Sequence, residues 1–107
     1  MANVSISIIL RVWEKASSIP GYDPDIWRKD FAGAWIRKDS YGMHTKYGWE
    51  IDHLQPLSKG GTNDENNLTA IHWQNNITKG ADYPKFNTSV TSEGNRNIEQ
   101  RKKWQLQ

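Results

Sequence analysis

The sequence predicts a small α+β protein that folds as a single domain over residues 1–107. Two strand-like runs lie in the middle of the chain, and a segment with helical spacing follows them. A chain of this length has room for only one hydrophobic core. The sequence contains no cysteine, so disulfides and thiolate zinc sites are excluded.

The N-terminal quarter has a pattern that fits two structures. Apolar residues alternate from Val4 to Val12, which favours a strand, although residues 13–16 are equally compatible with a helix. Residues 19–25 contain two prolines and a glycine, and we expect a loop there. A short helical turn is expected to follow over residues 23–28.

Residues 33–37 and 47–52 are predicted to pair as an antiparallel hairpin with a long, polar tip. Because side chains alternate along a strand, Glu50 and Asp52 share one face of the second segment. The apolar residues of that segment lie on the other face. The hairpin therefore has a packed side and an acidic side. His44, in the tip, is expected to be exposed, with DNA contact as the alternative.

The rest of the chain continues the α+β pattern. Residues 54–66 form a loop that its proline and paired glycines restrict, and residues 67–79 have helical spacing up to a terminal Lys-Gly. We expect a closing strand over residues 86–91 and a short helix over residues 96–105. The core motif occupies about residues 33–80.

Composition indicates a water-soluble protein with a weak preference for polyanions. The formal net charge is +2, which does not by itself identify a nucleic-acid-binding protein. No apolar run approaches the length that spans a bilayer, and no signal-peptide pattern is present. We therefore expect a cytoplasmic protein without membrane association. Six Trp, four Tyr and two Phe are expected to fill most of the small core.

Three polar residues in the motif have the chemistry that phosphodiester hydrolysis requires. This reaction needs an activated water, stabilisation of charge on phosphorus, and help for the departing 3′ oxygen. His53 is a natural proton acceptor, and Asp52 is the hard oxygen ligand that Mg²⁺-like ions prefer. Asn76 can add a neutral oxygen if the helix turns it toward Asp52. Because neighbours on a strand point to opposite sides, Asp52 and His53 can act together only if the strand bends there.

The order of these residues resembles the motif of HNH nucleases, which is also called the ββα-metal site. The similarity is expected to cover about residues 12–82, and the matching positions are Asp52-His53, Pro56, Gly60-Gly61, Asn67-Leu68, Asn76 and Lys79-Gly80. The resemblance implies a ββα-metal core made of a hairpin and a helix. It also implies an endonuclease that hydrolyses DNA with one divalent metal ion.

Carried over by position, the family's functional residues fall on four residues of this sequence. The resemblance makes Asp52 and Asn76 the metal ligands and His53 the general base. Asn67 is implied to pin the loop so that His53 keeps its orientation. A plain helix cap is the other interpretation of Asn67.

Two further residues have roles that the resemblance leaves less defined. Glu50, three residues before His53, is similar to an acid that orients the site in some relatives, through an arginine such as Arg37 or Arg28. His72 is either an extra ligand or a structural histidine. Many relatives carry zinc-binding cysteines where this chain has His72 and Asn75. We expect packing of the tryptophans to replace that zinc, namely Trp35, Trp49 and Trp73.

The resemblance implies Mg²⁺ as the ion, with Mn²⁺, Ni²⁺ and Zn²⁺ as alternatives. The expected partner is double- or single-stranded DNA, whose phosphates Lys59, Lys79 and Arg37 are candidates to contact. An immunity protein or an assembly protein is the remaining partner class. Two other functions stay open: a catalytically inactive module of the HNH fold that binds metal or DNA, and a ribonuclease.

Overall fold

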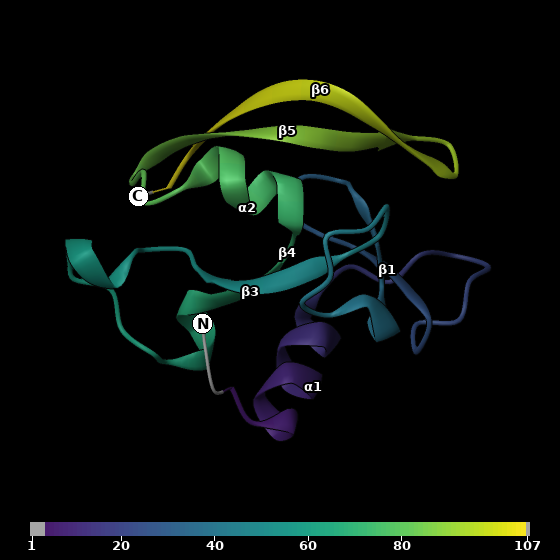
Figure 1. Cartoon of the computed structure of the whole chain (residues 1–107), viewed down its shortest axis with the longest axis horizontal. Coiled ribbons are helices and arrows are strands. Elements are labelled where there is room, and N and C mark those ends of the chain that lie inside the picture. Colours follow the sequence, from purple (N-terminus) through teal and green to yellow (C-terminus); the bar gives the residue numbers. More distant parts are fainter. Residues whose placement is uncertain (1–3, 107) are drawn as a thin grey trace.

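The chain is described over residues 4–106 of a computed structural model, and in these residues two helices and six strands are arranged in layers. Hairpin β5–β6 lies over helix α2, α2 lies over the pair β3–β4, and helix α1 lies beneath that pair (Figure 1). The pair β1–β2 flanks the stack. The bounds are α1 Ile6–Lys15, β1 Trp27–Lys29, β2 Trp35–Arg37, β3 Trp49–His53, β4 Leu68–His72, α2 Trp73–Lys79, β5 Lys85–Glu93 and β6 Arg96–Gln105. The predicted α+β class is confirmed.

The N-terminal segment is a helix, so the strand that the alternation favoured is wrong and the helical alternative is right. Ser5 caps α1, because its hydroxyl oxygen accepts a hydrogen bond from the backbone N–H of Ile8. Val12 and Trp13 are buried on the inner face. Ile8 and Ile9, one turn earlier, pack on the same core cluster. The apolar side chains of α1 therefore lie along one face of the helix, which packs on the core. This burial favours the helix over the strand that the alternating pattern predicted.

The strand pairing differs from the predicted hairpin. β2 pairs with the short strand β1, and β3 pairs antiparallel with β4, with Trp49 opposite His72 and His53 opposite Leu68. The predicted pairing of residues 33–37 with 47–52 is therefore wrong. The observed pairing buries apolar side chains of α1, β2, β3 and β4 in one core, which consists of Val12, Trp13, Ile36, Trp49, Ile51, Leu68 and Ala70.

Helix α2 is shorter than predicted. Residues 68–72, expected as its first turns, form strand β4 and bury Leu68 and Ile71. The helix begins at Trp73 and ends at Gly80, as the Lys-Gly signal predicted. Gly80 has φ 55° and ψ −140°, a backbone conformation that residues with a Cβ rarely adopt.

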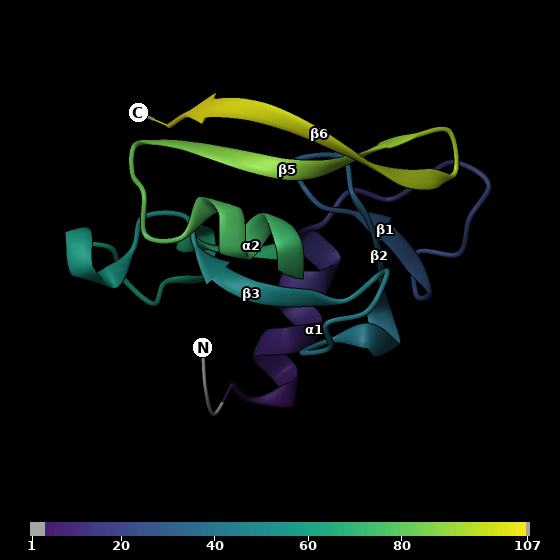
Figure 2. The same cartoon turned by 45° about the horizontal axis from the view of Figure 1, so that its top comes forward.

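The C-terminal segment forms a long antiparallel ribbon above α2 (Figure 2). The expected strand over residues 86–91 is confirmed within β5, whereas the expected helix over residues 96–105 is wrong, because β6 is a strand. Phe86 of β5 stands opposite Trp104 of β6, and both rings contact Phe31 edge-on. Over residues 4–106, neither helix is long and apolar enough to span a membrane.

Candidate functional site

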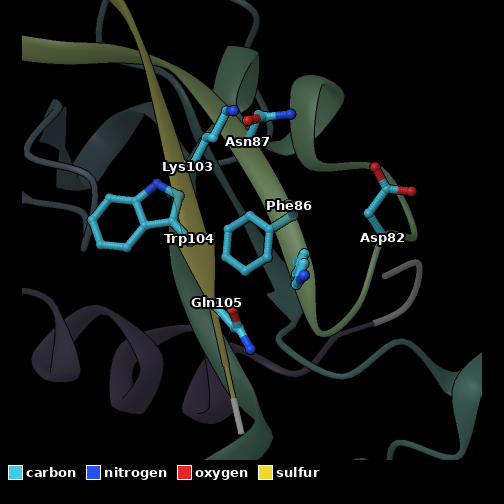
Figure 3. A pocket seen from close by; sticks show the side chains of 7 residues that line it. Asp82, Phe86, Asn87, Lys103, Trp104 and Gln105 are labelled. Atoms are coloured by element: carbon cyan, nitrogen blue, oxygen red, sulfur yellow. The ribbon is translucent and has the colours of Figure 1, made fainter.

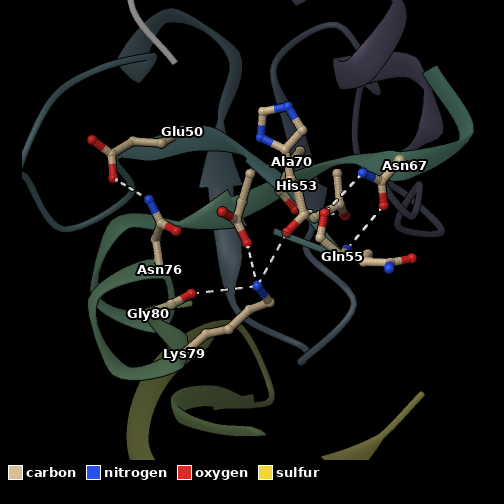
Figure 4. Close-up of polar contacts among 10 residues, drawn as sticks. Glu50, His53, Gln55, Asn67, Ala70, Asn76, Lys79 and Gly80 are labelled. Carbon is tan, nitrogen blue, oxygen red and sulfur yellow. Dashed lines mark hydrogen bonds and ion pairs between the residues drawn. The ribbon is translucent and has the colours of Figure 1, made fainter. Parts of the chain in front are cut away.

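The acidic face of β3 lies against α2, and there the two elements bring four polar side chains together (Figure 4). Glu50 and Asp52 alternate onto this face, as predicted. Asn76 and Lys79 are three residues apart on α2 and share a helix face. Asn76 Nδ2 donates to Glu50 Oε1 over 3.0 Å, which turns the amide oxygen of Asn76 away from that carboxylate. The side chain of Asn76 is thus hydrogen-bonded to Glu50, whereas the sequence predicted that it would point toward Asp52.

Lys79 is the buried cation of this site. Its side chain is 0% exposed, its ammonium lies 2.8 Å from Asp52 Oδ2, and it donates to the carbonyl of His53 over 3.1 Å. Asp52 Oδ2 is itself buried, and it forms an ion pair with the ammonium of Lys79. The expected contact of Lys79 with nucleic-acid phosphates is therefore wrong, because its ammonium is buried and contacts Asp52 and the carbonyl of His53.

The ring of His53 points away from Lys79 (Figure 4). It also lies on the opposite face of β3 from its neighbour Asp52, because side chains alternate along a strand. The strand remains regular through His53, which pairs with Leu68, so the predicted bend between residues 52 and 53 does not occur. His53 Nε2 lies 2.8 Å from Asn63 Oδ1. Since an amide oxygen accepts, Nε2 carries the hydrogen, and in the neutral ring Nδ1 then keeps a lone pair that can accept a proton.

Asn67 holds the loop that begins directly after His53. Its amide donates to the carbonyls of Gln55 and Thr62, and its oxygen accepts from the backbone N–H of Gln55. Gly61 lies inside this clasp, where a Cβ would come within 1.8 Å of the carbonyl oxygen of Gln55. These contacts are those of a loop clasp and not of a helix cap, because α2 begins at Trp73.

His72 is a structural residue at the start of α2. It is buried, its Nε2 donates to the carbonyl of Lys46, and its Nδ1 accepts from the backbone N–H of Gln74. Burial lowers the pKa of His72 below its ordinary value, against the effect of the Lys46 carbonyl. The neutral ring is therefore favoured, and only the neutral ring can cap the helix through Nδ1.

A buried aspartate joins the two positions at which many relatives carry cysteine. Asp30 Oδ2 accepts from the backbone N–H of His72 and from Asn75 Nδ2, each over 3.0 Å. Asp30 Oδ1 accepts from the backbone N–H groups of Ala32 and Ala34. Burial raises the pKa of Asp30 above its ordinary value, and these N–H donations oppose that rise.

Asn75 extends the same network to the C-terminal ribbon. Its Oδ1 accepts from the backbone N–H groups of Ser89 and Val90, and its Nδ2 also donates to the carbonyl of Val90. The tryptophan packing expected in place of a zinc ion is therefore joined by a hydrogen-bond network. Through Asp30 and Asn75, this network ties α2, β4, β5 and the segment before β2 together.

The arginines predicted to hold Glu50 lie elsewhere. Arg37 pairs with Asp39 over 2.9 Å, and Arg28 donates to three backbone carbonyls beside α1. Glu50 instead faces His44, whose Nε2 lies 3.6 Å from Glu50 Oε2. No local pattern in the sequence pointed to this pair. Lys59 is exposed, in the loop after β3, and remains a candidate for phosphate contact.

A shallow pocket of about 460 Å³ lies apart from these side chains, beside the open end of the C-terminal ribbon (Figure 3). Its walls are Asp82, Lys85, Phe86, Asn87, Lys103, Trp104 and Gln105. None of the residues predicted to be functional lines it. Two of its residues contact Lys79: the ring centroid of Phe86 is 5.3 Å from the Lys79 ammonium, and the backbone N–H of Asp82 donates to the carbonyl of Lys79.

A family model of HNH endonucleases matches residues 38–82, the stretch that contains β3, β4 and α2. The resemblance predicted from the motif is therefore confirmed over this stretch, in a form without cysteine. The match begins later than the expected residue 12. No curated protein and no solved structure matches the chain.

Proposed function

We propose that this protein is a divalent-metal-dependent endonuclease that hydrolyses DNA phosphodiester bonds, with Asp52 and Asn76 as metal ligands and His53 as general base. The family match to residues 38–82 supports the nuclease class. The observation that supports the metal assignment is that Asp52 and Asn76 lie where β3 packs against α2. Lys79 pairs with Oδ2 of Asp52, so Oδ1 is the oxygen that we propose as the ligand. We further propose that the protein acts in the cytoplasm.

The donor set suits a hard cation such as Mg²⁺ or Mn²⁺. Asp52 contributes a carboxylate, and the amide of Asn76 is oriented with its nitrogen toward Glu50, so its oxygen can serve as a ligand. Few protein oxygens are needed, because such ions keep several waters and bind substrate phosphate. When bound, the ion would supply charge stabilisation at phosphorus and at the departing 3′ oxygen.

The residues around the ligands have separate tasks. Lys79 forms an ion pair with Asp52 and donates a hydrogen bond to the carbonyl of His53. These two contacts fix residues 52 and 53 at the end of β3. His53, with Nε2 held by Asn63, presents Nδ1 as the acceptor for the proton of the attacking water. Because β3 does not bend between Asp52 and His53, the proposal places this water at the edge of the strand, where side chains from both faces can reach it. Asn67 clasps the loop that follows and thereby maintains the position of this imidazole.

We expect the protein to recognise DNA mainly through its phosphates. Exposed Lys59 lies in the loop after the general base, where it can contact the strand on either side of the cut. Contacts of this kind give little base specificity and an affinity that falls steeply with salt.

The test is a plasmid-cleavage assay with Mg²⁺, Mn²⁺, Ni²⁺ or Zn²⁺, and with EDTA. We expect nicked or linear plasmid with at least one ion and intact plasmid in EDTA, because the ion offsets the charge that develops at phosphorus. RNA and single-stranded DNA of matched sequence define the substrate class. Cleavage that persists in EDTA would contradict the metal assignment, and intact plasmid with every ion would favour a binding module without activity.

A further inference from the structure

His44 lies on the side of β3 that carries the proposed metal ligands. Of the three histidines, His72 is buried and His53 is on the opposite face of the strand. The side chain of His44 is 57% exposed, and its Nε2 lies 3.6 Å from Glu50 Oε2. Since Glu50 also accepts from Asn76, one carboxylate connects His44 to a proposed metal ligand.

The ring of His44 is fixed although it is exposed. It stacks on the indole of Trp73, with ring centroids 4.5 Å apart and planes inclined by 11°. Trp73 Nε1 donates to the carbonyl of Thr45 over 2.6 Å, and the backbone N–H of Trp73 donates to the carbonyl of Gly48. The loop that carries His44 is thus attached to the first residue of α2.

Close backbone packing makes this loop rigid as well. A Cβ at Gly48 would come within 1.7 Å of the carbonyl oxygen of Met43, so the two segments of the loop touch directly. His72 adds a hydrogen bond to the carbonyl of Lys46. The side chain of His44 is therefore preorganised, as residues that bind a ligand in a defined geometry need to be.

The N–H of the imidazole remains available to a ligand. A separation of 3.6 Å is too long for a hydrogen bond, so the contact with Glu50 leaves the ring N–H free to donate to a ligand. We propose that His44 donates this hydrogen bond to a phosphate oxygen of the nucleic acid, next to the phosphate that is cut. The inference rests on the proposed function, since it assigns a second substrate contact to the same site.

The test uses three variants of the full chain. His44→Phe keeps a ring that can stack on Trp73 but removes the N–H, His44→Gln keeps a donor, and Ser18→Ala is an exposed control. We measure the affinity for a short DNA duplex in EDTA at several salt concentrations, and kcat and KM in the active ion. Thermal unfolding confirms that the variants are folded.

We expect His44→Phe to weaken duplex binding about tenfold, the scale of one hydrogen-bonded contact to a charged group, whereas His44→Gln retains part of the affinity. The control should match wild type. Duplex binding and cleavage by His44→Phe equal to wild type would overturn the inference, and so would a wild-type protein that binds no duplex. If wild type cuts nothing and His44→Phe still weakens binding, the phosphate contact stands and the nuclease assignment fails.

Discussion

Replacement of His53 by Ala is expected to lower kcat for DNA cleavage by about 100- to 10,000-fold, the contribution typical of a positioned general base. The imidazole is the proposed acceptor for the proton of the attacking water, and its Nε2 is held by Asn63. The affinity for the metal ion should change little, because the side chain of His53 is not a proposed ligand. The measurement is single-turnover cleavage of a labelled duplex in the ion that supports activity.

Two further variants separate a base from a structural residue. Added imidazole should restore part of the activity of His53→Ala, since it can enter the space of the missing ring and accept the proton. Asn63→Ala, which releases Nε2 but keeps the imidazole, should lose less activity than His53→Ala. Activity of His53→Ala within about threefold of wild type would exclude the base assignment, because a general base contributes far more than this.

Replacement of Asp30 by Ala is expected to cost about 3–5 kcal/mol of folding free energy, because each buried donor left without an acceptor costs about 1–3 kcal/mol. The carboxylate receives hydrogen bonds from the backbone N–H groups of Ala32, Ala34 and His72 and from the side chain of Asn75. Without it, β4 and α2 lose their connection to the segment before β2. Urea unfolding followed by tryptophan fluorescence measures the loss.

Asp25→Ala is the matched control, because this aspartate is 79% exposed and its ion pair with Lys38 is long, at 3.7 Å. We expect a change within about 0.5 kcal/mol for it, as is usual at the surface. A cost below about 1 kcal/mol for Asp30→Ala would mean that the network does not hold the domain together, since one lost acceptor alone costs that much.

The sequence predicted the positions of the motif better than the pairing of the strands. Glu50 and Asp52 share a face because alternation along a strand is local, and Gly80 ends α2 because a terminal glycine is a local signal. Which strand pairs with β3 is decided by the common core. Leu68 and Ile71 are three residues apart, which fits a helix, whereas in a strand they lie on opposite faces. Both faces of β4 are covered, by α1 and α2, and both residues are buried, so the strand forms.

The polar contacts of the site depended on tertiary structure and could not be predicted. Lys79 is a surface lysine by every local criterion, yet the fold encloses it beside Asp52 and Phe86. His44 and Asp30 reach their partners across 6 residues and across more than 40 residues of sequence, respectively. No spacing rule covers either separation, so only the folded chain reveals the Asp30 network and the contact of His44 with Glu50.

Calorimetric titration of Mn²⁺ into the protein tests the central assignment most directly, because it detects the ion without requiring catalysis. We expect wild type to bind one ion per chain. Asp52→Asn, which keeps the size of the side chain, should bind at least about tenfold more weakly, since altered partners of a metal ligand alone cost 10–100-fold. No uptake by wild type, or equal affinity in Asp52→Asn, would contradict the account.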